Sequence, residues 1–299
     1  MADDKETIQK VLQVAQEAAR LAGQTILEVT ETSNNNIQSK SSSTDLVTET
    51  DQKCEALITQ CIQTAFPTHA IIGEETSAAR YELTDHPTWT IDPIDGTTNF
   101  VHQLQMSCVI ISYIVNGNVQ VGVIYDPYMD ELFYAVKGQG AFVQHKDKTR
   151  PIHVSSTTSI PQAVISLDPG YGRDVPTVER FGQLQKAILF QGVRNIRVIG
   201  ATGLNMTKVA AGRLDAALEE GSWESGNGPK IWDFAAGRLL VEEAGGVTVD
   251  MERPPQELQP ADGSLPPPLD LMKRSFFCAS SHELAASLLQ VIAKSRQSS

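Results

Sequence analysis

The residues best suited to chemistry lie in one acidic segment, Trp89-Thr-Ile-Asp92-Pro-Ile-Asp95-Gly-Thr-Thr-Asn-Phe100. Its apolar start predicts the end of a buried strand, and Pro93, which has no N–H to donate to a sheet, is expected to end that strand. Asp92 and Asp95 then project from a turn, three residues apart. Two carboxylates this close repel each other unless cations lie between them. The segment indicates metal ions, although an Asp-rich turn in which Asp95 only caps a helix is the simpler alternative.

The residues after this turn predict a phosphate site. Gly96 permits backbone conformations that a side chain would block, and Thr97-Thr98-Asn99 is expected to open a helix. The free N–H groups of a helix start bind anions. The segment therefore combines the signals for metal ions and for a phosphate beside them.

Three more acids occur where a fold presents side chains to a site. Asp51 is expected in the first turn of a helix, although capping alone would explain it. Glu74 follows a predicted short buried strand at 70–72 and a glycine, although a solvated acidic loop has the same pattern. Asp233 is expected to be the N-cap of another helix. Carboxylate oxygens suit a hard cation, and no His or Cys pair accompanies them, so magnesium is predicted rather than zinc or copper.

The elements that must position these acids are mixed helices and strands. Residues 4–29 predict an amphipathic helix, and residues 30–43 a polar surface loop that carries Lys40. An antiparallel hairpin is expected from 107 to 125, with its turn at 116–118. Residues 252–269 contain six prolines and predict a surface excursion away from the chemistry. Further strands are expected at 132–136, 163–167, 194–199, 214–219 and 276–279, and further helices at 51–65, 177–189, 200–211, 231–244 and 281–292.

Composition restricts the functional class. The chain has 24 basic and 36 acidic side chains, a net charge of −12, which argues against nucleic acid as a partner. Neither a signal peptide nor an apolar run of membrane-spanning length is evident, so no membrane partner is expected. Four scattered cysteines without metal-ligand spacing favour a reduced, cytoplasmic protein.

Taken together, the motifs resemble those of inositol monophosphatases. Gly73-Glu-Glu-Thr76, the segment from Asp92 to Phe100, and Trp232-Asp233 with a following Glu-Ala-Gly-Gly match the family's signatures, and Asp45-Leu-Val-Thr-Glu-Thr-Asp51 fits them too. The resemblance runs from the first helix to the last. It implies an α/β, layered αβαβα sandwich of the inositol monophosphatase and fructose-bisphosphatase type, a homodimer, two or three Mg²⁺ ions and inhibition by lithium. One domain, residues 1–299, is expected, whose halves, 1–150 and 151–299, meet at the active site.

The resemblance also implies a role for each site residue. Glu74, Asp92 and the Ile94 carbonyl would hold one ion, and Asp92, Asp95 and Asp233 a second. Glu74 and water would hold a third, under a flap that carries Lys40. Thr97, paired with Asp51, would orient the attacking water, with Glu74 as the third catalytic residue. The substrate would contact Asp95, Gly96, Thr97, Gly200, Ala201, Thr202, Glu219 and Asp233.

The expected reaction is Mg²⁺-dependent hydrolysis of a phosphate monoester, inositol 1-phosphate, by direct attack of a metal-activated water. A histidinol-phosphate or sugar-phosphate phosphatase of the same superfamily is the alternative, and a catalytically silent binding protein a more remote one. The chain departs from the family at Gly200-Ala-Thr-Gly203, where the polar residue is shifted by one, in a longer loop between Glu219 and Asp233, and in an extra Pro-rich segment after Arg253. The first two departures lie on the substrate side and leave the metal side unchanged.

Overall fold

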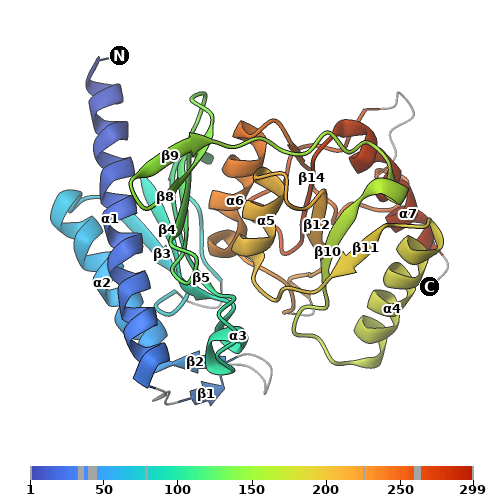
Figure 1. Ribbon diagram of the computed structural model, residues 1–299, viewed down its shortest axis with the longest axis horizontal. Coiled ribbons are helices and arrows are strands. Elements are labelled where there is room, and N and C mark those ends of the chain that lie inside the picture. The colour runs from blue at the N-terminus through green and yellow to red at the C-terminus, as the bar shows by residue number, and fades with distance from the viewer. Residues whose placement is uncertain are drawn as a thin grey trace.

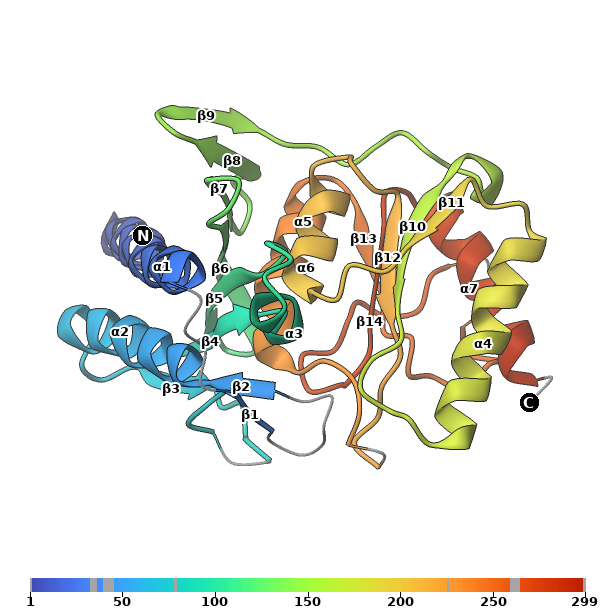
Figure 2. The same ribbon diagram turned by 60° about the horizontal axis from the view of Figure 1, so that its bottom comes forward.

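Helices and sheets alternate in five layers (Figure 1). The computed structural model describes residues 2–32, 37–39, 46–77, 80–224, 226–258 and 264–297. A seven-stranded sheet and a five-stranded sheet enclose a middle pair of helices, and one further pair covers the outer face of each sheet (Figures 1 and 2). The pairs are α1 (Ala2–Thr32) with α2 (Glu49–Ala65), α5 (Thr202–Ala210) with α6 (Ile231–Glu243), and α4 (Val175–Phe190) with α7 (His282–Gln297). The predicted αβαβα layering is confirmed.

The seven-stranded sheet is antiparallel except for its first pair, β3 and β4. The hairpin turn at Asn116-Gly117 has positive φ at both residues, 49° and 67°, which Asn and Gly tolerate and which suits a two-residue hairpin. The last two strands were not predicted: both are short, and the final one is entirely exposed, so neither shows a sustained apolar alternation. In spatial order the strands are β3 (Ala70–Gly73), β4 (Thr88–Asp95), β5 (Cys108–Val115), β6 (Asn118–Asp126), β7 (Glu131–Val136), β8 (Ala141–His145) and β9 (Lys148–Pro151).

The five-stranded sheet brings two acids to one edge. Its central strands β10 and β12 run parallel, with Asp168 directly opposite Glu219 at their carboxyl ends. In spatial order the strands are β11 (Asn195–Arg197), β10 (Val164–Asp168), β12 (Ala216–Glu219), β14 (Phe276–Ala279) and β13 (Val247–Thr248), and a 3-10 turn, η1 (Ile160–Gln162), precedes β10.

Two predicted boundaries are wrong. β4 does not end at Pro93, because the pairing of β4 with β5 shifts between Asp92 and Asp95, and a bulge there does not need the missing N–H. The predicted loop over 30–43 is also partly regular: α1 extends to Thr32, and β1 (Ile37–Ser39) pairs with β2 (Leu46–Thr48), which leads into α2. Lys40 lies outside the described residues, so the flap stays a prediction.

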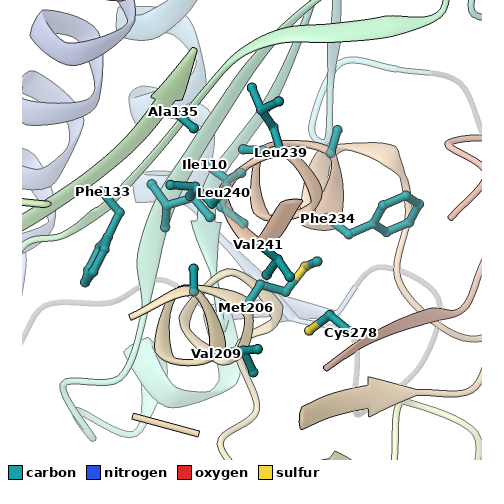
Figure 3. Packing of buried hydrophobic residues seen from close by; sticks show 14 of the residues in the cluster. Ile110, Phe133, Ala135, Met206, Val209, Phe234, Leu239, Leu240, Val241 and Cys278 are labelled. Atoms are coloured by element: carbon teal, nitrogen blue, oxygen red, sulfur yellow. The ribbon is translucent and has the colours of Figure 1, made fainter. Parts of the chain in front are cut away.

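The core lies in three apolar layers that hold the sheets and helices in register. β5 shows how: Val109 and Ile111 pack toward α1 and α2, while Ile110 packs toward α5 and α6. The middle helix α6 is apolar over most of its surface because sheets flank it, as the packing of Phe234, Leu239, Leu240 and Val241 in Figure 3 shows. Each such buried side chain contributes roughly 1.5–3 kcal/mol of transfer free energy. Within the described part of the chain, no helix has the length and apolar character needed to cross a membrane.

Candidate active site

Three acids from separate parts of the chain meet at one point. Glu74 follows β3, Asp92 belongs to β4, and Asp233 lies in the first turn of α6. One carboxylate oxygen of each lies within 4.8 Å of those of the other two. Asp92 is buried, whereas Glu74 and Asp233 are partly exposed. This is a set of oxygen donors that a hard divalent cation, kept partly hydrated, prefers.

The position of Asp233 differs from the predicted N-cap. The N-cap of α6 is Lys230, and Asp233 is three residues further on, where its carboxylate accepts a hydrogen bond from the Lys230 N–H. Since this bond uses only Oδ2, the side chain of Asp233 still takes part in the acidic group.

The electrostatics of the acidic group favour a bound cation. Burial raises the pKa of Asp92 well above its ordinary value, and the charges of Glu74, Asp95 and Asp233 raise it further. Burial, followed by the charge of Glu74, raises the pKa of Asp233 to about 6. The ionised carboxylates therefore destabilise one another unless positive charge lies between them. The donor set and its charge fit Mg²⁺.

Asp95 turns its carboxylate toward α5 instead. Oδ1 accepts a hydrogen bond from the Thr202 N–H at 3.1 Å, and Oδ2 accepts one from the Gly203 N–H at 2.7 Å. The Cys108 thiol also donates to Oδ2, at 3.3 Å. Burial, together with the charge of Asp233, raises the pKa of Asp95 to about 8. Asp95 thus caps α5, a helix more than one hundred residues further along the chain.

Thr97 and Asp51 meet next to this group. The Thr97 hydroxyl lies 3.2 Å from Asp51 Oδ1 and 3.0 Å from the Ile94 carbonyl oxygen. The Ile94 N–H in turn donates to Asp92 Oδ1 at 3.0 Å. Asp51 is fully buried in the first turn of α2, where its Oδ2 accepts hydrogen bonds from the N–H and hydroxyl of Thr48. The structure therefore links Asp51 to the acidic group through Thr97 and Ile94.

Gly96 joins this region to the substrate side. It is the N-cap of α3 (Thr97–Val101), with φ of 84°. A Cβ there would lie 2.9 Å from the Met106 carbonyl oxygen and 3.0 Å from Ala201 Cβ, so only glycine fits. Asn99 in α3 donates to the carbonyls of Met106 and Ile199, at 2.9 and 2.8 Å. Gly200 and Ala201 are thereby held against the start of α3.

The sequence prediction missed Asp168, which supports the same segment. Its carboxylate accepts hydrogen bonds from the Ile199 N–H at 2.9 Å and the Gly200 N–H at 3.2 Å, and another from the Asn205 amide. Glu219 is buried opposite it, and burial followed by the charge of Asp168 raises the pKa of Glu219 well above its ordinary value. Asp168 ends a strand before Pro-Gly, much as Glu219 ends one before Glu-Gly, and this pattern could have drawn attention to it.

The sequence prediction also missed Arg274, which holds the loop between β12 and α6. Its buried guanidinium donates to the carbonyls of Gly226, Gly228 and Pro229 and lies 4.8 Å from the centre of the Trp223 ring. The backbone N–H of Arg274 donates to the carboxylate of Glu252. The Pro-rich segment was predicted to lie away from the chemistry, and its first residue, Glu252, contacts the backbone of Arg274 rather than the loop that leads to Asp233.

Comparison with known proteins gives consistent matches over the whole chain. The model of the inositol monophosphatase family matches residues 7–297. Inositol monophosphatase 3 of Solanum lycopersicum is 42% identical over 246 residues, which cover 82% of this chain and 87% of the relative. Inositol monophosphatase 1 of Bos taurus is 37% identical over 279 residues, 92% of each chain. The solved IMPase of Thermotoga maritima superposes with a TM-score of 0.76 at 27% identity and covers 100% of this chain and 99% of that one.

Proposed function

The chain belongs to the inositol monophosphatase family, and we propose that it hydrolyses inositol 1-phosphate to myo-inositol and phosphate with bound Mg²⁺. Membership makes it a phosphoric monoester hydrolase. One observation carries the proposed route: the group formed by Glu74, Asp92 and Asp233 is joined through Ile94 to the Thr97–Asp51 pair.

We assign the metal ions to the acidic group together with Asp95 and the Ile94 carbonyl. Glu74, Asp92 and the Ile94 carbonyl would hold one ion, Asp92, Asp95 and Asp233 a second, and Glu74 with water a third. Bound there, Mg²⁺ would supply Lewis-acid stabilisation of the phosphate oxygens and lower the pKa of a water. If lithium replaces one of the ions, it should inhibit; an activity unaffected by millimolar-range lithium would rule out this part of the proposal.

Thr97 and Asp51 would prepare the nucleophile. When the Thr97 hydroxyl donates its proton to Asp51, its oxygen is free to accept a hydrogen bond from a water. Asp51 thus fixes the direction of the hydroxyl and provides a base for the proton lost as the water attacks phosphorus. We assign the phosphate to the amides of Gly96 and Thr97, at the start of α3.

A covalent phosphoenzyme is not part of this route. The structure brings one thiol, Cys108, into contact with Asp95, but burial and the charge of Asp95 raise its pKa well above the ordinary value. A buried, protonated thiol is a poor nucleophile. Phosphate found on any side chain after rapid quenching would contradict direct hydrolysis.

Glu219 and residues 200–202 would bind the alcohol. A carboxylate accepts hydrogen bonds from adjacent ring hydroxyls, and Glu219 lies at the carboxyl edge of the five-stranded sheet beside Asp168. A substrate panel tests this assignment: phosphate release from inositol 1-phosphate, histidinol phosphate, hexose 1-phosphates, fructose bisphosphate and phosphoadenosine phosphate, each with Mg²⁺. We expect the highest kcat/KM for inositol 1-phosphate, and a preference for histidinol phosphate would reject the inositol assignment.

The two halves of the chain would act as one domain, because Glu74 and Asp92 come from residues 1–150 and Asp233 from residues 151–299. Neither half alone should then bind Mg²⁺ with the affinity of the whole chain. All four cysteines lie in the described part and are free thiols, which fits the cytoplasm. The family resemblance further suggests a homodimer, and a monomeric mass by light scattering would exclude it.

A further inference from the structure

We propose that Glu55 is a positioning residue for Glu74 and thereby tunes the affinity of the metal centre. The proposal rests on the metal binding assigned above. Glu55 belongs to α2 and lies one helical turn after Asp51, on the same face. Neither its position nor its neighbours in the sequence mark it as part of the site.

The Glu55 carboxylate lies against the backbone on both sides of Glu74. Oε2 accepts a hydrogen bond from the Glu75 N–H at 2.7 Å. A Cβ built on Gly73 would lie 2.5 Å from Glu55 Cδ and Oε1 and 2.7 Å from Oε2, so the carboxylate occupies the space that any larger residue would need. The residues before and after Glu74 are therefore both in contact with one side chain.

Glu55 is costly as a purely structural residue. Its side chain is 1% exposed, and among the described residues Oε1 has no hydrogen-bond partner. Burying a carboxylate whose oxygens are only partly paired destabilises the fold, and an apolar residue of similar size avoids this cost. The single bond to Glu75 does not offset that cost, but a role in fixing the turn beside a metal ligand explains why a carboxylate is there.

The turn needs such an anchor. The Glu74 N–H donates to the Ile91 carbonyl and the Ser77 N–H to the Gly73 carbonyl, each at 3.0 Å, and these bonds hold the start and the end of the turn. Glu75 and Thr76 line a groove of about 710 Å³ along α2, together with Glu55 itself, so this side of the turn has open space beside it. The bond from Glu75 to Glu55 holds the turn on this side. Because α2 also carries Asp51, one helix then sets the distance between the metal ligand and the Thr97–Asp51 pair.

Calorimetric Mg²⁺ titration of the full chain without substrate tests the proposal. Supporting partners of metal ligands are worth about 10–100-fold in metal affinity, so we expect Glu55→Ala to raise the Kd for Mg²⁺ by that factor. Turnover should recover at saturating Mg²⁺. Glu55→Gln keeps an oxygen that accepts the hydrogen bond from the Glu75 N–H. Its Kd for Mg²⁺ should therefore stay within about threefold of that of the unmodified protein.

Glu243→Ala is the matched control. Glu243 is also a helix glutamate whose carboxylate accepts turn amides, those of Gly138 and Gly140, both at 2.7 Å. That turn joins β7 to β8 and contains none of the assigned metal ligands. Glu243→Ala should lower thermal stability to an extent similar to Glu55→Ala and leave the Kd for Mg²⁺ unchanged.

Gly73→Ala tests the contact from its other side. The new methyl group collides with the Glu55 carboxylate, so this variant should also weaken Mg²⁺ binding. In the Glu55→Ala background the colliding atoms are gone, and Gly73→Ala should add little, a coupling that a double-mutant cycle measures. If Glu55→Ala does not fold, Gly73→Ala alone decides. Unchanged Mg²⁺ affinity in the folded variants overturns the role of Glu55, whereas an unmodified protein that binds no Mg²⁺ overturns the metal centre itself.

Discussion

Replacing Asp51 by asparagine tests the most specific step of the proposed reaction. Asp51 Oδ2 accepts two hydrogen bonds from Thr48, whereas Oδ1 accepts one from Thr97. An asparagine satisfies Thr48 only if its oxygen takes the Oδ2 position. Its NH₂ group then faces Thr97 and can no longer accept the hydroxyl proton. The cap of α2 is preserved, and the loss is restricted to the contact with Thr97 and to the charge.

The magnitudes follow from these contacts. Loss of a positioned base lowers turnover by about 10²–10⁴-fold. KM should change little, because Asp51 is buried and makes no proposed contact with the substrate, so kcat and kcat/KM should fall together. Loss of one hydrogen bond to a charged group costs roughly 1.5–3 kcal/mol of folding stability. Most molecules of the variant should therefore remain folded at 25 °C.

The assay is steady-state phosphate release at saturating Mg²⁺, with circular dichroism melts of each variant. Glu49→Gln is the matched control, because it removes an exposed acid from the same first turn of α2. We expect it to retain its activity. If Asp51→Asn keeps more than about a tenth of the turnover, the general-base reasoning fails. A large rise in KM at constant kcat would instead place Asp51 in substrate binding.

Further predictions concern the ions, the pH dependence and the alcohol. Asp92→Asn should abolish phosphate release and weaken Mg²⁺ binding together, and loss of only one of the two would separate Asp92 from the shared ligand role. In chelator, the melting temperature should fall as the pH rises from about 4 to about 8. Folding raises the pKa of Asp233 from 3.8 to about 6 and the pKa of Asp95 from 3.8 to about 8. The folded chain therefore holds protons that the unfolded chain has already lost, and the stability that these protons contribute disappears through that pH range. Excess Mg²⁺ should remove this decline, as melts at several pH values would show. Glu219→Gln should raise KM for inositol 1-phosphate by about 10–100-fold, because a hydrogen bond to a charged group is worth that factor in binding. The KM for a phosphate ester without ring hydroxyls should be nearly unaffected. Equal losses on both substrates would assign Glu219 to a structural role.

The local signals of the sequence were enough to identify most elements of the site. Strand ends and helix starts are visible as changes of pattern, and they placed Glu74 after β3 and Asp51 in the first turn of α2. Trp89 to Ile91 was recognised as the end of a strand, but the strand was expected to stop at Pro93, because a bulge cannot be predicted from one strand alone.

The remaining contacts depend on partners that only the folded chain supplies. Asp95 was expected to hold a metal ion. Its hydrogen bonds to the start of α5 could not be predicted, because they follow from packing between residues more than one hundred positions apart. Glu55 was missed because its partner is a backbone amide, which every residue but proline has and which no side-chain pattern marks. Asp168 ends a strand as Glu219 does, but its partners, two backbone amides and the Asn205 side chain, lie more than thirty residues further along the chain. Such contacts require the tertiary structure.

We expect the acidic group of Glu74, Asp92 and Asp233 to hydrolyse a phosphate monoester only when its metal is bound. The most direct test follows phosphate release from inositol 1-phosphate by one protein sample in Mg²⁺, after complete chelation, and after Mg²⁺ is restored. Activity should disappear on chelation and return with Mg²⁺. Hydrolysis that continues at an undiminished rate in excess chelator would contradict this expectation.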